Sequence, residues 1–186
     1  MLHELKYHRR KSYLEIGEIF FWTATINSWK YLLHNDKYKN VITNSLQYLT
    51  DKGKIDVFAF VVMPNHIHLI WRIKESNGKE TTQGSFLKHT AHEFKKILQK
   101  DSEQSLSVYK VDAANKQYEF WQRDSLAIPI YTKEVAFQKL DYIHYNPLRG
   151  KWKLVNDPFH YKYSSARYYE LGIKEFLWLK DLREEF

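Results

Sequence analysis

Two apolar segments separated by a Pro-Asn turn constrain the fold of this chain more than any other feature. The first covers residues 55–63, the turn is Pro64-Asn65, and the second covers residues 66–73. Both segments are rich in β-branched and aromatic residues, and two such segments joined by a short turn are typical of a β-hairpin. The sequence therefore predicts two antiparallel strands that meet at Pro64-Asn65.

His66 and His68 open the second of these strands. Side chains alternate between the faces of a strand, so both imidazoles point one way while Ile67 and Leu69 point the other. The spacing places the histidines about 7 Å apart on one face, and imidazole is the commonest metal ligand near pH 7. A His-x-His pair on its own is more often incidental than metal-binding, so a metal site needs further ligands from elsewhere in the chain.

The composition is that of a single globular domain with a basic character. At 186 residues the chain fits one domain, and its net charge of +7 with 17% aromatic residues suits nucleic acid, although aromatic residues also fill cores. The chain has no cysteine, so a metal must be held by His, carboxylate, amide or water. No apolar run reaches the roughly 18 residues of a membrane span, and the N-terminus lacks the apolar part of a secretory signal. We therefore expect a cytoplasmic protein with no membrane partner.

The remaining segments supply the parts of an α+β sheet. Residues 16–26 are expected to form a strand, and a helix is expected from Asn35-Asp36 to Gly53. Residues 85–100 carry an apolar stripe and predict an amphipathic helix. A polar loop with one short strand is expected over 101–116, and further short strands over 118–121 and 126–131.

The order of these elements predicts the architecture. Strand, helix, strand, strand, helix, strand is the order of the ferredoxin-like, split βαβ fold, an antiparallel sheet with helices on one face. In that fold the strand with the histidines is central. Its helix-covered face takes Ile67, Leu69 and Trp71, and its other face presents the two imidazoles.

A helix predicted for residues 133–146 carries the second group of candidate site residues. Thr132 is a suitable N-cap, and Pro147 ends the helix. Tyr142 and Asn146 stand four residues apart, so they share one face of the helix. One helical turn thus presents a phenol and an amide side by side.

These segments resemble a known family. His66-Ile67-His68 resembles the histidine-hydrophobe-histidine signature of the HUH nucleases, and the segment from Tyr142 to Pro147 resembles the catalytic helix of the single-tyrosine HUH transposases. Phe120-Trp121-Gln122 and Tyr163-Ser164-Ser165-Ala166 are also similar to segments of that group. The likeness is greatest to the REP-associated tyrosine transposases and the related small insertion-sequence transposases, and it covers residues 16–170.

The resemblance implies a DNA transposase that cleaves and rejoins single-stranded DNA. His66 and His68, with Asn146 as third ligand, would hold one Mg²⁺ or Mn²⁺ ion that keeps positions open for water and phosphate. Tyr142 would attack the phosphorus, expel the 3′-hydroxyl and leave a 5′-phosphotyrosine link, which the 3′-hydroxyl of a second strand would then attack. The catalytic-tyrosine helix is thereby expected near the face of the sheet opposite the other helices.

The third ligand and the activation of the phenol stay open. Gln138 shares a helix face with Tyr142, whereas His144 lies about 160° away around the helix. A free phenol has a pKa near 10, so the tyrosine needs activation. The metal-bound phosphate and Lys139 are the candidates, although a solvated surface lysine is the commoner role.

The resemblance also implies a partner and a domain organisation. Single-stranded DNA with a hairpin is the expected partner, and the family contains both monomers and dimers, so a homodimer stays open. Residues 1–15 are expected to form a basic N-terminal arm, 16–147 the nuclease domain, and 148–186 a helical extension packed on it. The candidate DNA-binding residues lie in the arm, in a loop before the last strand and on the tyrosine helix: Arg9, Arg10, Lys11, Gln122, Arg123 and Lys139.

Two other functions compete with this hypothesis. A domesticated DNA- or RNA-binding protein would keep the fold, but it has no need of His66, His68, Tyr142 and Asn146 together. A metal-dependent phosphodiesterase that activates water would not need Tyr142. The effect of replacing that tyrosine therefore separates the three functions.

Overall fold

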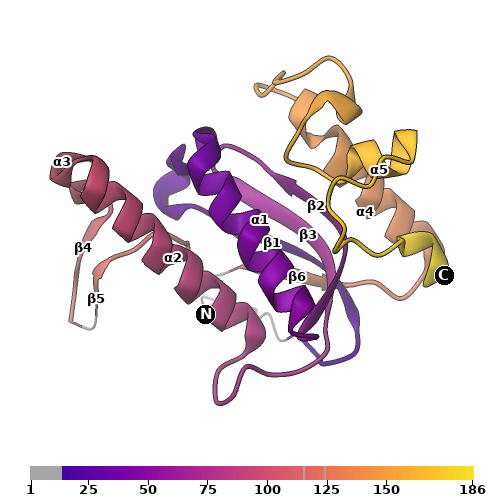
Figure 1. Ribbon diagram of the computed structural model, residues 1–186, viewed down its shortest axis with the longest axis horizontal. Helices are drawn as coiled ribbons and strands as arrows, with labels where there is room; N and C mark the ends of the chain where they lie inside the picture. Colours follow the sequence, from indigo (N-terminus) through magenta and orange to yellow (C-terminus); the bar gives the residue numbers. More distant parts are fainter. Residues whose placement is uncertain (1–13, 115, 124) are drawn as a thin grey trace, which may run out of the picture.

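A four-stranded antiparallel sheet forms the centre of the fold (Figure 1). The computed structural model describes residues 14–114, 116–123 and 125–186. The connections between the first and second strands and between the third and last strands of the sheet each contain a helix, so the predicted split βαβ, α+β fold is confirmed. In the order in which they lie, the strands are β2 (Ile55–Val62), β3 (His66–Ile73), β1 (Ile19–Thr25) and β6 (Leu126–Pro129).

The predicted hairpin of β2 and β3 forms with its turn at Pro64-Asn65. Met63 N donates a hydrogen bond to His66 O over 2.8 Å, and β3 begins at His66 as the sequence predicts. On its other side β3 pairs with β1, which places Thr23 opposite His68 in the ladder. Because β3 is bonded on both sides, the backbone that carries the histidines is fixed.

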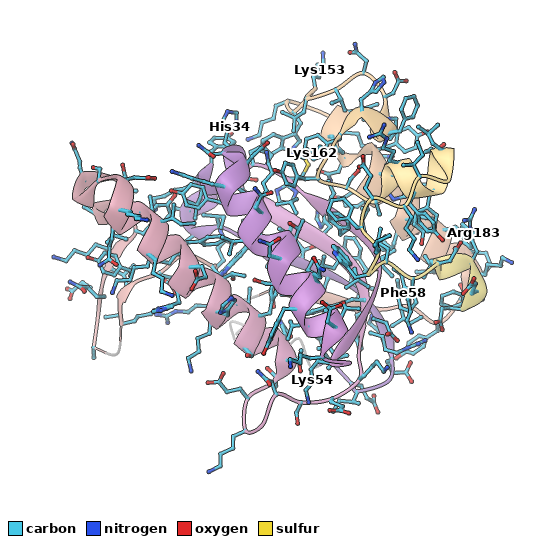
Figure 2. All side chains as sticks on the ribbon, viewed as in Figure 1. His34, Lys54, Phe58, Lys153, Lys162 and Arg183 are labelled. Atoms are coloured by element: carbon cyan, nitrogen blue, oxygen red, sulfur yellow. The ribbon has the colours of Figure 1, made fainter. Side chains whose placement is uncertain are left out.

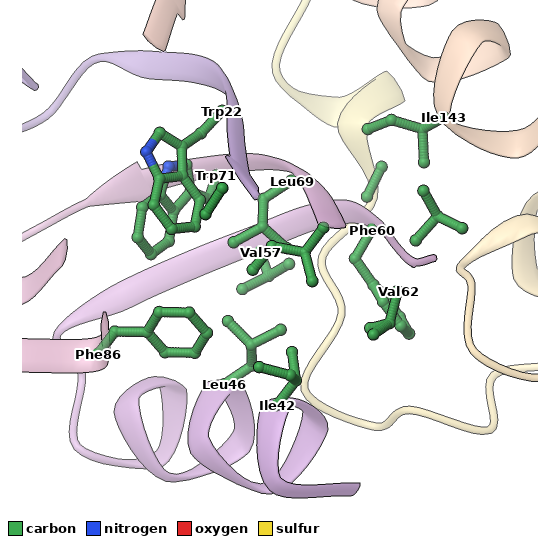
Figure 3. Packing of buried hydrophobic residues seen from close by; sticks show 14 of the residues in the cluster. Trp22, Ile42, Leu46, Val57, Phe60, Val62, Leu69, Trp71, Phe86 and Ile143 are labelled. Atoms are coloured by element: carbon green, nitrogen blue, oxygen red, sulfur yellow. The ribbon is translucent and has the colours of Figure 1, made fainter. Parts of the chain in front are cut away.

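Two helices cover one face of the sheet. α1 (Asp36–Asp51) is capped by the Asn35 side chain, and α2 (Thr82–Asp101) by Thr81. No helix among the described residues is long and apolar enough to span a bilayer. Figure 3 shows the core beneath these helices, where large buried side chains of helices and strands meet: Trp22, Ile42, Leu46, Leu69, Trp71 and Phe86.

The opposite face is covered by α4 (Lys133–Tyr145), which packs on β2 and β3. The Thr132 side chain accepts a hydrogen bond from Val135 N over 3.3 Å, so the predicted N-cap is confirmed. Leu140 and Ile143 are buried on the sheet side of the helix. The chain continues as the 3₁₀ turn η3 (Asn146–Leu148), because Pro147 has no N–H to extend an α-helix. The helix therefore ends within one residue of its predicted end.

His144 lies on the buried side of α4, 2% exposed, and ties the helix to the C-terminal segment. Its Nε2 is 2.8 Å from Ser165 Oγ, and that oxygen also accepts a hydrogen bond from Phe60 N over 3.0 Å. Burial lowers the pKa of His144 to about 4, so the ring is neutral at pH 7. In the unfolded chain the same ring takes up a proton near pH 6.5, whereas in the folded state it does so only at lower pH.

We expect acid to destabilise the fold through His144. Between about pH 6.5 and pH 4 the unfolded state binds more protons at this ring than the folded state. The free energy of unfolding therefore decreases as the pH is lowered through this range, by up to roughly 3 kcal/mol from His144. Urea denaturation at pH 7 and at pH 4.5 measures the loss. His144→Gln keeps a hydrogen-bonding group near Ser165 but does not titrate, so this variant should lose less stability than the wild type. Equal losses in the two proteins would contradict the assignment.

The segment from residue 148 to residue 186 runs along the outer edge of β2. Lys180 N donates to Val57 O over 2.9 Å, and Tyr169 Oη donates to Phe58 O over 2.8 Å. Figure 2 shows Phe58 of β2 and Arg183 of the C-terminal segment on the same side of the molecule. Covering an edge strand in this way removes a template for unwanted strand pairing.

This C-terminal segment contains less helix than the sequence predicts. Most of it is irregular, with short turns closed by hydrogen bonds within the segment and a few backbone hydrogen bonds to the edge of β2, such as Ser165 N to Phe60 O and Lys180 N to Val57 O. Its only helical elements are η4 (Pro158–His160), α5 (Ala166–Leu171) and η5 (Leu182–Glu184).

The segment between α2 and β6 also differs from the prediction. A short helix, α3 (Glu103–Ser107), precedes a separate two-stranded sheet of β4 (Lys110–Ala113) and β5 (Lys116–Tyr118). These strands pair only with each other and stay largely outside the core, so their polar composition resembles that of a loop. Trp121, predicted to lie in a strand, anchors the following loop, where its Nε1 donates to Thr90 Oγ1 over 3.0 Å.

Candidate active site

A cavity of about 530 Å³ opens on the face of the sheet that α4 covers. Residues of β1, β3 and α4 line it, together with the segments that follow β1 and α4. None of the described residues that line it is acidic, and two are basic. The lining residues with polar or ionisable groups that matter for chemistry are His66, His68, Tyr142, Asn146, Arg149 and Lys151.

The two histidines of β3 lie together in this cavity. His66 is 7% exposed and His68 is 5% exposed. Their ring centroids are 4.7 Å apart, closer than the strand spacing alone predicts, because the rings lean toward each other. Phe21 of β1 stacks on His68 with centroids 5.3 Å apart, so the pair is held in place by packing.

The hydrogen bonds of Asn65 determine which nitrogen of His66 is free. Asn65 Nδ2 donates to Trp29 O over 3.1 Å, which orients the amide, and Asn65 Oδ1 lies 2.7 Å from His66 Nδ1. An amide oxygen only accepts hydrogen bonds, so Nδ1 carries the proton. Nε2 of His66 therefore keeps its lone pair, the form in which imidazole binds a metal.

His68 is oriented in a similar way by Thr23, its neighbour across the ladder. Thr23 Oγ1 lies 2.7 Å from His68 Nδ1, while His68 Nε2 is buried without a hydrogen-bond partner. Buried polar atoms are nearly always paired, so this ring nitrogen is available to a group that enters the cavity.

Both imidazoles are neutral at pH 7. Burial lowers the pKa of His66 to about 4; the Asn146 side chain opposes this shift and Lys151 adds to it. Burial also holds the pKa of His68 well below its ordinary value, with smaller effects from His66 and Lys139. Metal ligands must be unprotonated, so these rings are ready to bind a cation without first losing a proton.

α4 brings Tyr142 and Asn146 to the same cavity. The Tyr142 ring packs edge-on against His68, with centroids 5.2 Å apart, and is 37% exposed. Asn146 is 7% exposed, and its Oδ1 is buried without a hydrogen-bond partner. The helix thus places a phenol and an unpaired amide oxygen beside the histidines.

These donors suit a small divalent cation. Nε2 of His68 and Oδ1 of Asn146 are both buried and unpaired, and His66 Nε2 adds a third lone pair. No group of three or more His, Asp or Glu side chains in the described part of the chain is placed to hold a metal, so an amide is needed to complete the set. The imidazole nitrogens suit first-row transition metals, and the amide oxygen, with positions open for water and phosphate, adds the oxygen ligands that Mn²⁺ and Mg²⁺ prefer.

Three basic side chains lie around the tyrosine. The Arg149 guanidinium carbon is 5.8 Å from the centroid of the Tyr142 ring, and Lys139 Nζ is 5.1 Å from that of Phe21. Lys151 lines the cavity at its other end. Lys139 therefore packs on Phe21 and does not line the cavity.

The other candidate residues lie elsewhere. Gln122 and Arg123 do not line the cavity, and Arg123 pairs with Glu119. Gln138 is exposed on α4 outside the cavity, and His144 is buried against Ser165, so neither alternative third ligand reaches the histidines. The arm residues Arg9, Arg10 and Lys11 lie outside the described residues.

Sequence reasoning missed several residues of this site. Thr23 follows from alternation along β1, because a strand paired with β3 must present side chains to the histidine face. Asn65 stands directly before His66, where an amide in a tight turn is a signal of local hydrogen bonding. Arg149, Trp29 and Trp152 come from irregular segments, for which no periodicity exists.

We expect Asn65 to tune metal affinity through His66. Asn65→Leu removes the acceptor for Nδ1–H and leaves the ring free to change tautomer, so Mn²⁺ affinity should fall by about 10- to 100-fold. Mn²⁺ binding is measured by electron paramagnetic resonance of the free ion. Asn65→Asp keeps an acceptor and should retain most of the affinity. Unchanged binding by Asn65→Leu would show that the amide does not position the ring.

Comparison with known proteins gives likenesses in structure alone. No family model and no curated protein matches the chain. The chain is similar to a solved structure described as a REP-associated tyrosine transposase bound to a REP hairpin, with a TM-score of 0.60 and 19% identity over 91% of this chain and 90% of the other. This likeness shows a common fold. It supports the predicted family at the level of the fold, and no comparison of sequences adds to that support.

Proposed function

We propose that this chain is a metal-dependent DNA transposase and endonuclease that cleaves and rejoins single-stranded DNA at a hairpin. The observation that carries the proposal is the Tyr142 phenol beside two buried, unpaired ligand atoms, Nε2 of His68 and Oδ1 of Asn146. The protein of similar fold is a tyrosine transposase bound to a hairpin, which supports the same class of activity and partner.

In this proposal His66, His68 and Asn146 hold one Mg²⁺ or Mn²⁺ ion. When bound, the ion supplies Lewis-acid polarisation of the scissile phosphate and offsets charge that develops on its oxygens. The protein contributes neutral imidazoles, Asn65 sets the tautomer of His66, and Asn65 and Thr23 keep the two rings in place.

Tyr142 acts as the nucleophile. Its Oη gives up its proton to solvent and attacks the phosphorus in line, the bond from phosphorus to the 3′-oxygen breaks, and that oxygen takes up a proton to leave as a 3′-hydroxyl. The 5′ side of the break stays linked to the tyrosine. Arg149, beside the phenol ring, is placed to stabilise the phenolate and the phosphate charge.

Rejoining follows the same path in reverse. The 3′-hydroxyl of another strand attacks the phosphotyrosine, and Tyr142 leaves as the phenolate and is reprotonated. One phosphodiester bond is broken and one is made, so strand transfer needs no external energy source.

A pool of hairpin-bearing single strands with randomised flanks tests this proposal without knowledge of the target sequence. With Mg²⁺ or Mn²⁺, DNA labelled at its 3′ end should become covalently bound to the protein, while DNA labelled at its 5′ end should be released as shorter fragments. Chelation of the metal should prevent both. Cleavage without protein-bound label would indicate attack by water, and binding without cleavage would indicate a hairpin-binding protein.

A further inference from the structure

Two exposed aromatic side chains, Trp29 and Tyr31, and the half-buried Trp152 border the cavity next to His66. We call Trp29, Tyr31 and Trp152 the aromatic platform. Trp29 is 58% exposed and Tyr31 is 54% exposed, and the edge of Tyr31 packs on Trp152 with centroids 5.8 Å apart. Large rings clustered in water at the edge of a cavity are a typical feature of a binding surface.

The platform is continuous with the candidate active site. The His66 ring centroid is 5.9 Å from that of Trp152 and 6.3 Å from that of Trp29. Both tryptophans also line the cavity. A molecule with one group in the cavity therefore has its neighbouring group over the platform.

The backbone that holds Trp29 in this position is in a strained conformation. Ser28 and Trp29 both have φ of 57°, a left-handed conformation that is rare for a bulky residue. The conformation is fixed by hydrogen bonds from Trp29 N to Ile26 O over 2.9 Å and from Asn65 Nδ2 to Trp29 O over 3.1 Å. Since the same Asn65 amide orients His66, one side chain sets the positions of both the ligand ring and the platform.

The charge around the platform indicates what it binds. Lys151 Nζ is 5.9 Å from the ring centroid of Tyr31 and 5.3 Å from that of Trp152. Arg149 lies two residues before it, and no acidic residue is among the described residues of the cavity. Flat rings next to cations are the combination that binds single-stranded nucleic acid, in which bases stack and phosphates pair with charge.

We propose that the aromatic platform stacks an unpaired base of the DNA strand adjacent to the scissile phosphate, with Lys151 at a neighbouring phosphate. This proposal rests on the proposed function, because the stacked strand is a substrate only if the protein cleaves DNA. Stacking on the platform fixes the strand in register, so that the phosphate next to the stacked base lies in the cavity.

The binding of a 12-residue oligothymidylate, measured by fluorescence anisotropy with the metal chelated, tests the stacking step apart from cleavage. Trp29→Ala and Trp152→Ala should each weaken binding by about 5- to 100-fold, the effect typical of one stacked base. Trp29→Phe should restore most of the affinity. A 12-residue strand of abasic sugar-phosphates should bind the wild type and Trp29→Ala alike, because it offers charge but no ring.

Tyr48→Ala is the matched control. Tyr48 is 61% exposed on α1, with Lys52 Nζ 5.8 Å from its ring centroid, and it lines a separate groove between α1 and α2. Its removal should leave binding unchanged. Wild-type affinity in Trp29→Ala and Trp152→Ala would overturn the platform even if the protein cleaves DNA. Ring-dependent binding without any cleavage would instead support the platform and contradict the nuclease.

Discussion

Tyr142→Phe is expected to abolish both the covalent DNA adduct and cleavage, by a factor on the order of 10⁴ or more, because the variant has no nucleophilic oxygen. The ring itself remains, so its packing on His68 and Phe21 and the overall stability should be preserved. Denaturing gel electrophoresis of end-labelled hairpin DNA gives both the adduct and the free fragments. Hairpin binding should stay within about 3-fold of the wild type, since phosphate contacts carry most of the affinity.

Tyr145→Phe provides the control for this change. Tyr145 lies three residues further along the same helix and is similarly exposed at 41%, but it does not line the cavity. Its variant should cleave normally. Cleavage that persists in Tyr142→Phe would eliminate the tyrosine mechanism and favour attack by water. Loss of cleavage in Tyr145→Phe alone would show that the nucleophile is Tyr145 and not Tyr142.

His68→Ala should reduce cleavage by at least about 100-fold while it spares hairpin binding. The substitution removes the ligand nitrogen that is buried and unpaired, and the Lewis-acid effect of a bound ion is worth several kcal/mol in the transition state. His66→Ala should behave similarly, because it removes the second ring. Cleavage rates measured at increasing Mn²⁺ concentration give the size of the loss. Excess Mn²⁺ should restore cleavage in a variant whose only defect is weaker metal binding.

His144→Gln is the matched control for the histidines. His144 is buried as His66 and His68 are, but it lies on the other side of α4 against Ser165. Its variant should cleave at the wild-type rate at pH 7. If His68→Ala lost hairpin binding and cleavage in equal measure, the histidines would serve the fold or the DNA interface and not the reaction.

The parts of the fold that follow a strict period could be predicted from the sequence. Alternation along residues 66–73 gives the shared face of His66 and His68, and helical spacing gives the shared face of Tyr142 and Asn146. Caps such as Asn35 and Thr132 set helix starts because they satisfy backbone N–H groups. Each of these depends on neighbours within a few residues.

What the sequence could not predict depends on contacts between distant segments. The β4–β5 hairpin pairs only with itself, so it lacks the apolar face that marks a strand. The C-terminal segment, expected to be helical, consists largely of short turns and irregular chain that follow the edge of β2. Arg149, Trp29 and Trp152 join the site only because two irregular loops meet beside His66. That Asn146 lines the cavity with the histidines, whereas Gln138 and His144 do not, likewise depends on how α4 lies on the sheet.

The residue to which DNA becomes attached tests the central proposal most directly. Wild-type protein is incubated with the hairpin pool and Mg²⁺, digested with a protease and a nuclease, and analysed by mass spectrometry. We expect one modified peptide, with a nucleotide linked through its 5′-phosphate to Tyr142, and none when the metal is chelated. Attachment to another tyrosine, or cleaved DNA with no modified peptide, would contradict the proposal.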